Sequence, residues 1–159
     1  MKTIVKIFLL AAVVVFAAGC GVHKSQSYYS QKPQIISTEL DGSYAIRCWG
    51  KGRNSDEAMK EVKKQAVYEV VFNGVTSASA NIQSLKPLIL TLNAKDKYAE
   101  WSNAFFADGG EYLNYCSKHD RRTGSSRFVR NRNEVLCQAV VSVDVAGLKK
   151  LLKESGIIK

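Results

Sequence analysis

Cys20 ends a leader segment and carries a thiol whose position predicts a defined chemistry. Two lysines, Lys2 and Lys6, precede an apolar run over residues 7–18. Small residues stand directly before the cysteine. A basic start, an apolar centre and small residues at the end form the pattern of a secretory signal. The run is short for a transmembrane helix, which needs about 20 apolar residues. The pattern predicts export and removal of residues 1–19, and a secretory signal with a chance cysteine is the alternative.

Residues 16–20, Phe-Ala-Ala-Gly-Cys, resemble the lipobox of bacterial lipoproteins. The resemblance implies that diacylglycerol is attached to the Cys20 sulfur and that the chain is then cut before this residue. Acyl chains contribute about 0.8 kcal/mol for each buried CH₂ group, so several chains hold a protein on a membrane almost permanently. Gly21 is not the aspartate that retains such proteins in the inner membrane, and no acidic cluster resembling a surface-export signal follows Cys20. The resemblance therefore implies an outer-membrane anchor on the periplasmic side.

The chain behind the leader has the size of one basic domain. Removing residues 1–19 leaves 140 of the 159 residues, and residues 20–34 are polar, without periodicity, and end near a proline. The sequence therefore predicts that residues 20–34 are a lipidated tether and that residues 35–159 form a single domain.

The formal net charge is +9, and loss of the two leader lysines leaves +7. A basic surface favours anionic partners, and outside the cytoplasm these are envelope polymers, lipid headgroups or acidic proteins rather than nucleic acid.

A basic segment between Lys118 and Glu134 is the second group of residues that could do chemistry. Besides Lys118 it contains five arginines and only two acids, Asp120 and Glu134. Planar guanidinium groups bind phosphate and carboxylate through paired hydrogen bonds. If the segment is a hairpin loop, it could hold an anionic partner, and a solvated loop without a partner is the alternative. The residues predicted to bind a partner here are Arg121, Arg122, Arg127 and Arg130.

The aromatic residues could lie in the core or in an interface. The residues in question are Trp49, Trp101, Phe105, Phe106 and Tyr112, and we expect most of them in the core. Phe106 is the best candidate for an exposed aromatic contact with a partner, because exposed aromatic side chains mark interaction surfaces.

The sequence lacks the motifs of metal, cofactor and hydrolase sites. With Cys20 acylated, Cys48, Cys116 and Cys137 remain, and no two of them have CxxC spacing. An oxidising compartment would permit one disulfide and leave one thiol over, whereas buried cysteines are the ordinary alternative. No Gly-x-Ser-x-Gly elbow is present, and the short spacing from Cys116 to His119 does not define a nucleophile and its base. We therefore expect no catalysis, no metal and no cofactor.

A hairpin and one long helix must position the N-terminal half. Residues 35–40 and 43–50 predict strands joined by the turn Asp41-Gly42. A helix follows that begins after Asn54 or Ser55 and ends at Asn73-Gly74. Its core-facing residues recur every four positions, namely Ala58, Val62, Ala66 and Val70. The intervening Gly-Lys-Gly at residues 50–52 lacks the rest of a phosphate-binding fingerprint, so it is interpreted as room for close backbone packing.

The C-terminal half predicts a mixture of helix and strand. Alternating apolar residues from Val135 to Val145 form the clearest strand. The remaining predictions are a second helix over residues 97–106, a strand over 112–116, a loop over 118–126 and an amphipathic helix over 146–153. The expected fold class is α+β, with a small antiparallel sheet, one long helix packed on it and a short C-terminal helix.

Residues 45–58, with Ala66 and Gly74 after them, resemble the N-terminal domain of the flagellar protein FlgT and the related family of small Gram-negative outer-membrane lipoproteins. The shared pattern is a strand, Gly-x-Gly, and a helix with periodic alanines and a closing glycine; the last strand and helix, up to Leu152, fit it too. The middle, around Pro87, Trp101 and residues 109–110, is similar to lipoproteins of the Bacteroidales. The resemblance implies an α+β domain without cofactor or catalysis, in proteins attached to larger envelope machines.

The sequence therefore favours a non-enzymatic lipoprotein, lipid-anchored in the outer membrane, that binds a protein partner in an envelope assembly. An accessory subunit of a secretion system, such as a type VI apparatus, is a specific version of this hypothesis. The alternative is a binding module for an envelope polymer or lipopolysaccharide that uses the basic segment.

Overall fold

The structure is a computed structural model that describes residues 32–119, 126–130 and 132–159. Cys20, Arg121 and Arg122 lie outside these residues. The α-helices are α2 (Ser55–Tyr68), α3 (Ala94–Lys97), α4 (Ala99–Phe105) and α5 (Val145–Glu154). The strands are β1 (Gln34–Thr38), β2 (Tyr44–Gly52), β3 (Thr76–Ser77), β4 (Cys116–Lys118), β5 (Ser126–Arg130) and β6 (Val135–Val143).

The strands form a six-stranded sheet in the order β3-β1-β2-β6-β4, with β5 also paired to β6. Since β2 pairs with the whole of β6 on one side, β4 and β5 follow each other along its opposite edge. The predicted α+β class and the β1–β2 hairpin are confirmed. The expectation of a purely antiparallel sheet is wrong, because β1 and β3 pair in parallel. Between β1 and β3 the chain passes through β2 and α2, and β3 then pairs with the edge of β1 opposite β2.

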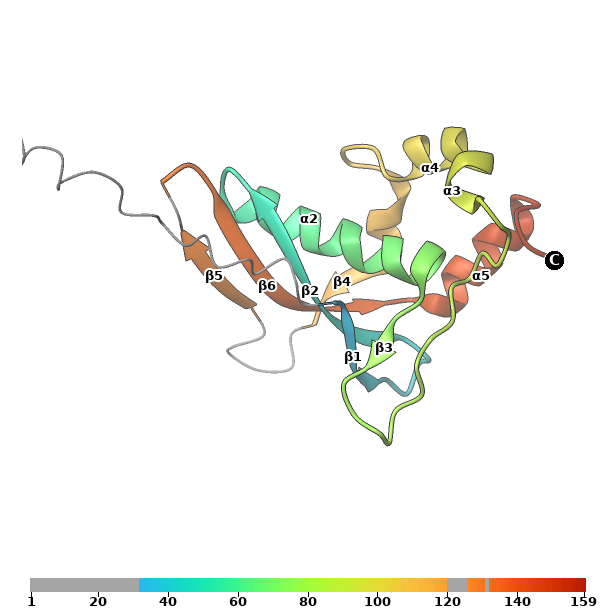
Figure 1. The fold of residues 1–159 in the computed structure, drawn as a ribbon, viewed down its shortest axis with the longest axis horizontal. Coiled ribbons are helices and arrows are strands. Elements are labelled where there is room, and N and C mark those ends of the chain that lie inside the picture. The colour runs from blue at the N-terminus through green and yellow to red at the C-terminus, as the bar shows by residue number, and fades with distance from the viewer. Residues whose placement is uncertain (1–31, 120–125, 131) are drawn as a thin grey trace, which may run out of the picture.

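Helix α2 lies across one face of the sheet, as the sequence predicts (Figure 1). The Asn54 side chain accepts a hydrogen bond from the Glu57 amide at 2.8 Å, and the Glu57 carboxylate accepts one from the Arg53 amide at 2.9 Å. These two hydrogen bonds form a variant of the capping box, in which Glu57 reaches the amide that precedes the cap, and they fix the start of the helix. The helix continues as a π-helical turn over Glu69–Asn73 and ends at Gly74, whose φ of 77° suits glycine.

Two glycines of β2 allow α2 to approach the sheet closely. A Cβ atom added to Gly50 would lie 2.3 Å from the Ala58 carbonyl oxygen, and one added to Gly52 would lie 2.4 Å from the Ala58 backbone nitrogen. Real Cβ atoms do not come this close to backbone atoms, so any other residue at these positions would push the helix away. The interpretation of this Gly-x-Gly as backbone room is confirmed.

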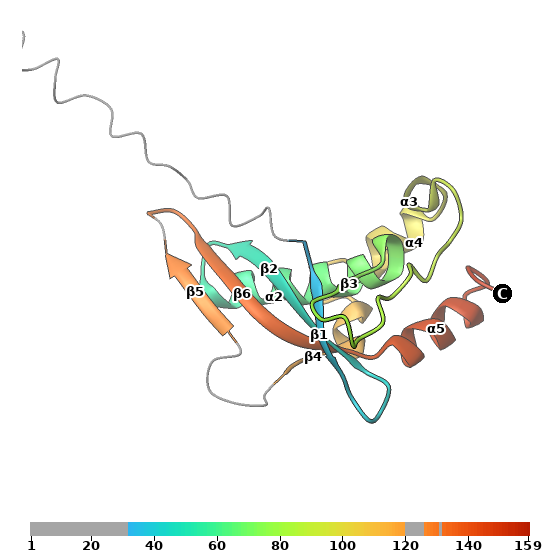
Figure 2. The same ribbon diagram turned by 60° about the horizontal axis from the view of Figure 1, so that its bottom comes forward.

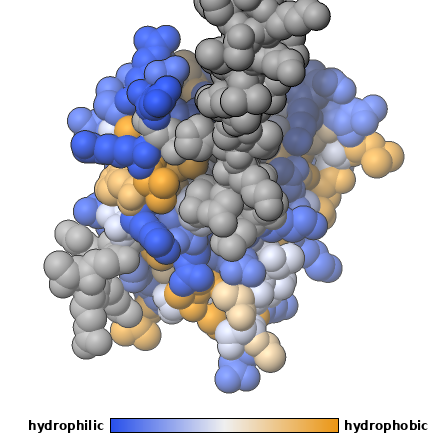
Figure 3. Space-filling model, turned by 60° about the vertical axis from the view of Figure 1, so that its left-hand side comes forward, coloured by the Kyte–Doolittle hydropathy of each residue, from blue (hydrophilic) through white to orange (hydrophobic). Residues whose placement is uncertain are grey.

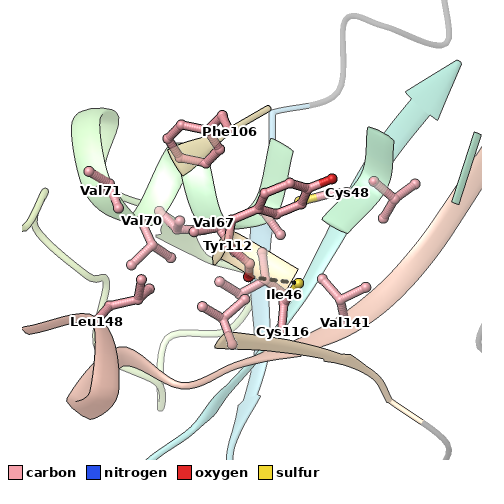
Figure 4. Close-up of a cluster of buried hydrophobic side chains, with 14 of the residues drawn as sticks. Ile46, Cys48, Val67, Val70, Val71, Phe106, Tyr112, Cys116, Val141 and Leu148 are labelled. Carbon is pink, nitrogen blue, oxygen red and sulfur yellow. Dashed lines mark hydrogen bonds between the residues drawn. The ribbon is translucent and has the colours of Figure 1, made fainter. Parts of the chain in front are cut away.

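The core fills the space between α2 and the sheet (Figure 4). Every second residue of β6 from Val135 to Val143 faces this core, in agreement with the predicted alternation. The last helix begins at Val145, where the Asp144 carboxylate accepts a hydrogen bond from the Gly147 amide at 2.8 Å. Leu148 and Leu152 of α5 are fully buried and close one end of the core.

The segment between α2 and β4 differs from the prediction in two places. The expected helix over residues 97–106 is two short helices, α3 and α4, because the backbone breaks at Tyr98. The predicted strand over 112–116 is wrong, because Glu111–Tyr115 is a 3₁₀ helix. A three-residue turn puts Tyr112 and Tyr115 on the same side. Their rings then pack on Phe106 and Phe105, at centroid distances of 5.8 and 6.1 Å.

Candidate interaction surfaces

The predicted aromatic contact, Phe106, belongs to the core. Its side chain is 5% exposed and packs edge-on against Phe105, with 4.9 Å between the ring centroids. Tyr68 of α2 contacts it at 5.6 Å, and Figure 4 shows the ring beside this helix. The expectation that Phe106 is exposed is wrong, because aromatic residues from α2 and from the 3₁₀ helix enclose it. Phe106 therefore stabilises the packing of α4 and is no partner contact.

The basic segment is divided between the two faces of β5. Arg127 and Arg130 are both exposed, but they pair with Gln138 and Val135 of β6, which point to opposite faces. Directly opposed residues share a face, so the two arginines are separated by the sheet. The sequence predicted a loop here and missed strand β5, and Arg121 and Arg122 lie outside the described residues. Arg127 and Arg130 thus do not form one anion-binding patch.

The face of the sheet opposite α2 carries Arg127 and forms a surface that we call the open face. The views in Figures 1 and 2 show α2, α3 and α4 on the other side of the sheet. Strand register places nine of its residues in three rows across the strands. The rows are Gln34, Arg47 and Val140; Trp49, Gln138 and Arg127; and Lys51, Leu136 and Val129.

The open face combines positive charge with apolar and aromatic area. Arg47, Lys51 and Arg127 are exposed, whereas Trp49 is partly buried. None of the nine positions holds an acid, and the Lys51 ammonium pairs with the Glu134 carboxylate at the edge. The Trp49 ring lies in the same row as Arg127, with Gln138 between them. This arrangement complements an acidic surface in charge.

A polar pocket of about 460 Å³ lies between the β1–β2 turn and β4. The His119 Nδ1 atom lies 2.8 Å from a carboxylate oxygen of Glu39, which orients the imidazole. Ser117 and Ser142 also line the pocket. Neither hydroxyl is hydrogen-bonded to the imidazole, so the described residues do not form a nucleophile–base pair.

The three cysteines of the domain are buried and free. Among the described residues, Cys48, Cys116 and Cys137 form no disulfide. Burial, together with the Glu69 carboxylate, raises the pKa of the Cys48 thiol above its ordinary value. Burial also raises the pKa of Cys116 and of Cys137 to about 11, although Lys63 and Lys118 respectively act in the opposite direction. The reactive thiolate is therefore scarce at neutral pH, which fits the packing role expected for at least one of these thiols.

We expect these thiols to resist alkylation in the folded protein. A pKa about two units above normal lowers the thiolate fraction about 100-fold near neutral pH, and burial slows access further. With the Cys20→Ser variant, iodoacetamide labelling followed by mass spectrometry should modify three cysteines in urea and almost none without it. Because the folded state holds these protons more tightly, the free energy of unfolding should fall as the pH rises from about 9 to about 11. Rapid labelling of the folded protein would contradict the burial.

The described residues offer no metal site or membrane-spanning helix. Across residues 32–119, 126–130 and 132–159, no group of three or more His, Cys, Asp or Glu side chains could hold a metal ion. Within the same ranges, each helix is too short or too polar to cross a bilayer. No protein-family model matches the chain, and no curated protein or solved structure is significantly similar to it.

Proposed function

We propose that this protein is a non-enzymatic lipoprotein that binds a protein partner through the open face. Cys20 anchors it by lipid to the outer membrane, on the periplasmic side, and the tether of residues 20–34 gives the domain reach. The partner is a protein of an envelope assembly with an acidic surface. A secretion-system accessory subunit is the specific version of this role. The observation that carries the proposal is the acid-free row that joins Trp49 to Arg127 across the sheet.

The composition of the open face supports a protein partner. Tryptophan and arginine are the residues most enriched among the few that dominate binding energy in protein interfaces. Both occur here on regular strands, where the backbone holds them at fixed spacing. Rigid positioning lowers the entropy that is lost on binding. Positive charge from Arg47 and Arg127 would speed encounter with an acidic partner and exclude basic ones.

The alternative, an envelope-polymer module built on the basic segment, has less support. It needs Arg127 and Arg130 to act together, and β5 directs them to opposite faces. An extended polyanion that contacts one face would meet only one of them. The open face also offers partly exposed apolar area beside its charge, at Val129 and Val140.

Charge reversal on the open face tests the proposal. The double variant Arg47→Glu and Arg127→Glu should reduce recovery of a crosslinked protein partner from envelopes at least tenfold, because like charges would face an acidic surface. Arg130→Glu is the matched control, since it makes the same change on the opposite face of β5. The measurement is quantitative mass spectrometry after crosslinking. Equal recovery in the double variant and the control would contradict the proposal, as would loss of bound polymer without loss of any protein.

A further inference from the structure

A second polar hollow lies at the other end of the sheet, between the start of α2 and the β5–β6 turn. Its volume is about 590 Å³, and its lining includes Arg53, Arg130 and Arg132. Figure 3 looks toward this end of the molecule, where hydrophilic side chains make up much of the surface that is not grey. Arg53 stands between β2 and α2, Arg130 ends β5, and Arg132 follows in the turn. The segment before α2 and the end of β5 with the following turn thus bring three arginines to one cavity.

None of these three arginines forms an ion pair with a carboxylate of the described residues. Lys51 takes the Glu134 carboxylate, and Glu57 is used in the capping box of α2. Asp56 is the other acid of the lining. The lining therefore carries three arginines against two acids, and Lys51 already neutralises one of those acids, so the cavity keeps a net positive charge. Bringing like charges together is unfavourable, and a bound anion relieves this cost.

We propose that this hollow binds a phosphate group, as a phosphomonoester or a pyrophosphate. A guanidinium group donates paired hydrogen bonds that match phosphate oxygens, and three such groups suit a tetrahedral anion with more than one negative charge. A carboxylate offers only two oxygens and one charge. Ser55 and Asn133 line the same cavity and supply neutral donors. The phosphate belongs either to a phosphorylated envelope lipid or to a small soluble compound.

This site differs from a glycine-rich phosphate loop. The backbone of α2 packs directly against Gly50 and Gly52, which leaves no room beside them for a phosphate group. Among the first backbone amides of α2, that of Glu57 already donates a hydrogen bond to the Asn54 side chain. The guanidinium side chains are therefore the groups that bind the anion. The site lies apart from the open face and does not depend on the proposed partner.

Pyrophosphate titration of the full-length protein in neutral detergent tests the site. At about 0.15 M ionic strength, where diffuse surface attraction is screened, calorimetry should show saturable binding of one pyrophosphate per chain. Arg53→Gln and Arg132→Gln should each weaken it at least tenfold. Arg127→Gln, on the opposite face, is the matched control and should leave it unchanged. Circular dichroism spectra and melting curves of the variants first establish that they fold.

Two results would contradict the proposed phosphate site. One is the absence of saturable pyrophosphate binding at millimolar concentration. The other is an equal loss in Arg127→Gln and Arg132→Gln, which would show diffuse attraction to net charge. A second arm compares flotation with neutral vesicles and with vesicles that contain a phosphorylated lipid, using the Cys20→Ser protein. Flotation that needs both the phosphorylated lipid and Arg132 identifies a lipid as the source; pyrophosphate binding without flotation identifies a soluble one.

Discussion

Replacing Cys20 with serine is expected to move the protein from the membrane fraction to the soluble fraction. A hydroxyl does not replace the thiol in the attachment that the lipobox resemblance implies. Each acyl chain contributes about 0.8 kcal/mol for every buried CH₂ group. Without the lipid, the basic domain would bind the membrane surface only weakly. Every described helix is too short or too polar to span the bilayer in its place. The measurement is immunoblotting of fractionated envelopes after a high-salt wash.

The matched control for this experiment is Cys137→Ala. This change removes a thiol from the buried core and leaves the leader intact. It should lower stability moderately and leave the protein in the membrane fraction. A Cys20→Ser protein that still sediments with washed membranes would contradict the lipid anchor.

Replacing Gly50 with valine should unfold the domain or cost more than about 3 kcal/mol of unfolding free energy. The added Cβ would lie 2.3 Å from the Ala58 carbonyl oxygen and 2.5 Å from the Val62 backbone nitrogen. Backbone atoms of α2 cannot rotate away as a flexible side chain can. The whole helix would have to rise from the sheet, and Val62, Ala66 and Val67 would lose their buried contacts.

Urea denaturation followed by circular dichroism measures this cost. Gly109→Ala is a suitable control, because its φ is 73° but no atom lies within 4 Å of the added Cβ. That variant pays only for backbone strain, about 1 kcal/mol. A Gly50→Val protein as stable as Gly109→Ala would show that α2 does not pack on β2 as described.

The elements that the sequence predicted correctly are those with strong local signals. The Asn54 cap, the four-residue apolar repeat and Gly74 define α2, and alternation defines β6. The missed elements lack such signals. Strand β3 has two residues and exists only because β1 lies beside it, and β5 is a polar edge strand held by β6. The 3₁₀ helix over Glu111–Tyr115 has no periodic apolar pattern of its own, and its Tyr112 and Tyr115 rings pack on Phe106 and Phe105.

The candidate surfaces also divide into features that local sequence patterns predict and features that depend on distant residues. Strand alternation is a local property, so it puts Arg47 and Trp49 on the same face of β2, but the assignment of most aromatic residues to the core did not anticipate that Trp49 lies on the open face. Local patterns could not place Arg127 in the same row as Trp49, since that arrangement depends on the register of β6 with both of its neighbours. Phe106 was misassigned for a similar reason: Tyr68, 38 positions earlier in the chain, covers it.

Site-specific photocrosslinking from the open face tests the proposed partner binding most directly. A photoreactive residue at Gln138, between Trp49 and Arg127, should give one dominant covalent adduct with an acidic envelope protein in intact cells. The same residue at the exposed Lys150 position of α5 serves as the control and should give little of this adduct. An adduct from Lys150 but not from Gln138, or adducts from Gln138 only within its own chain, would contradict the account.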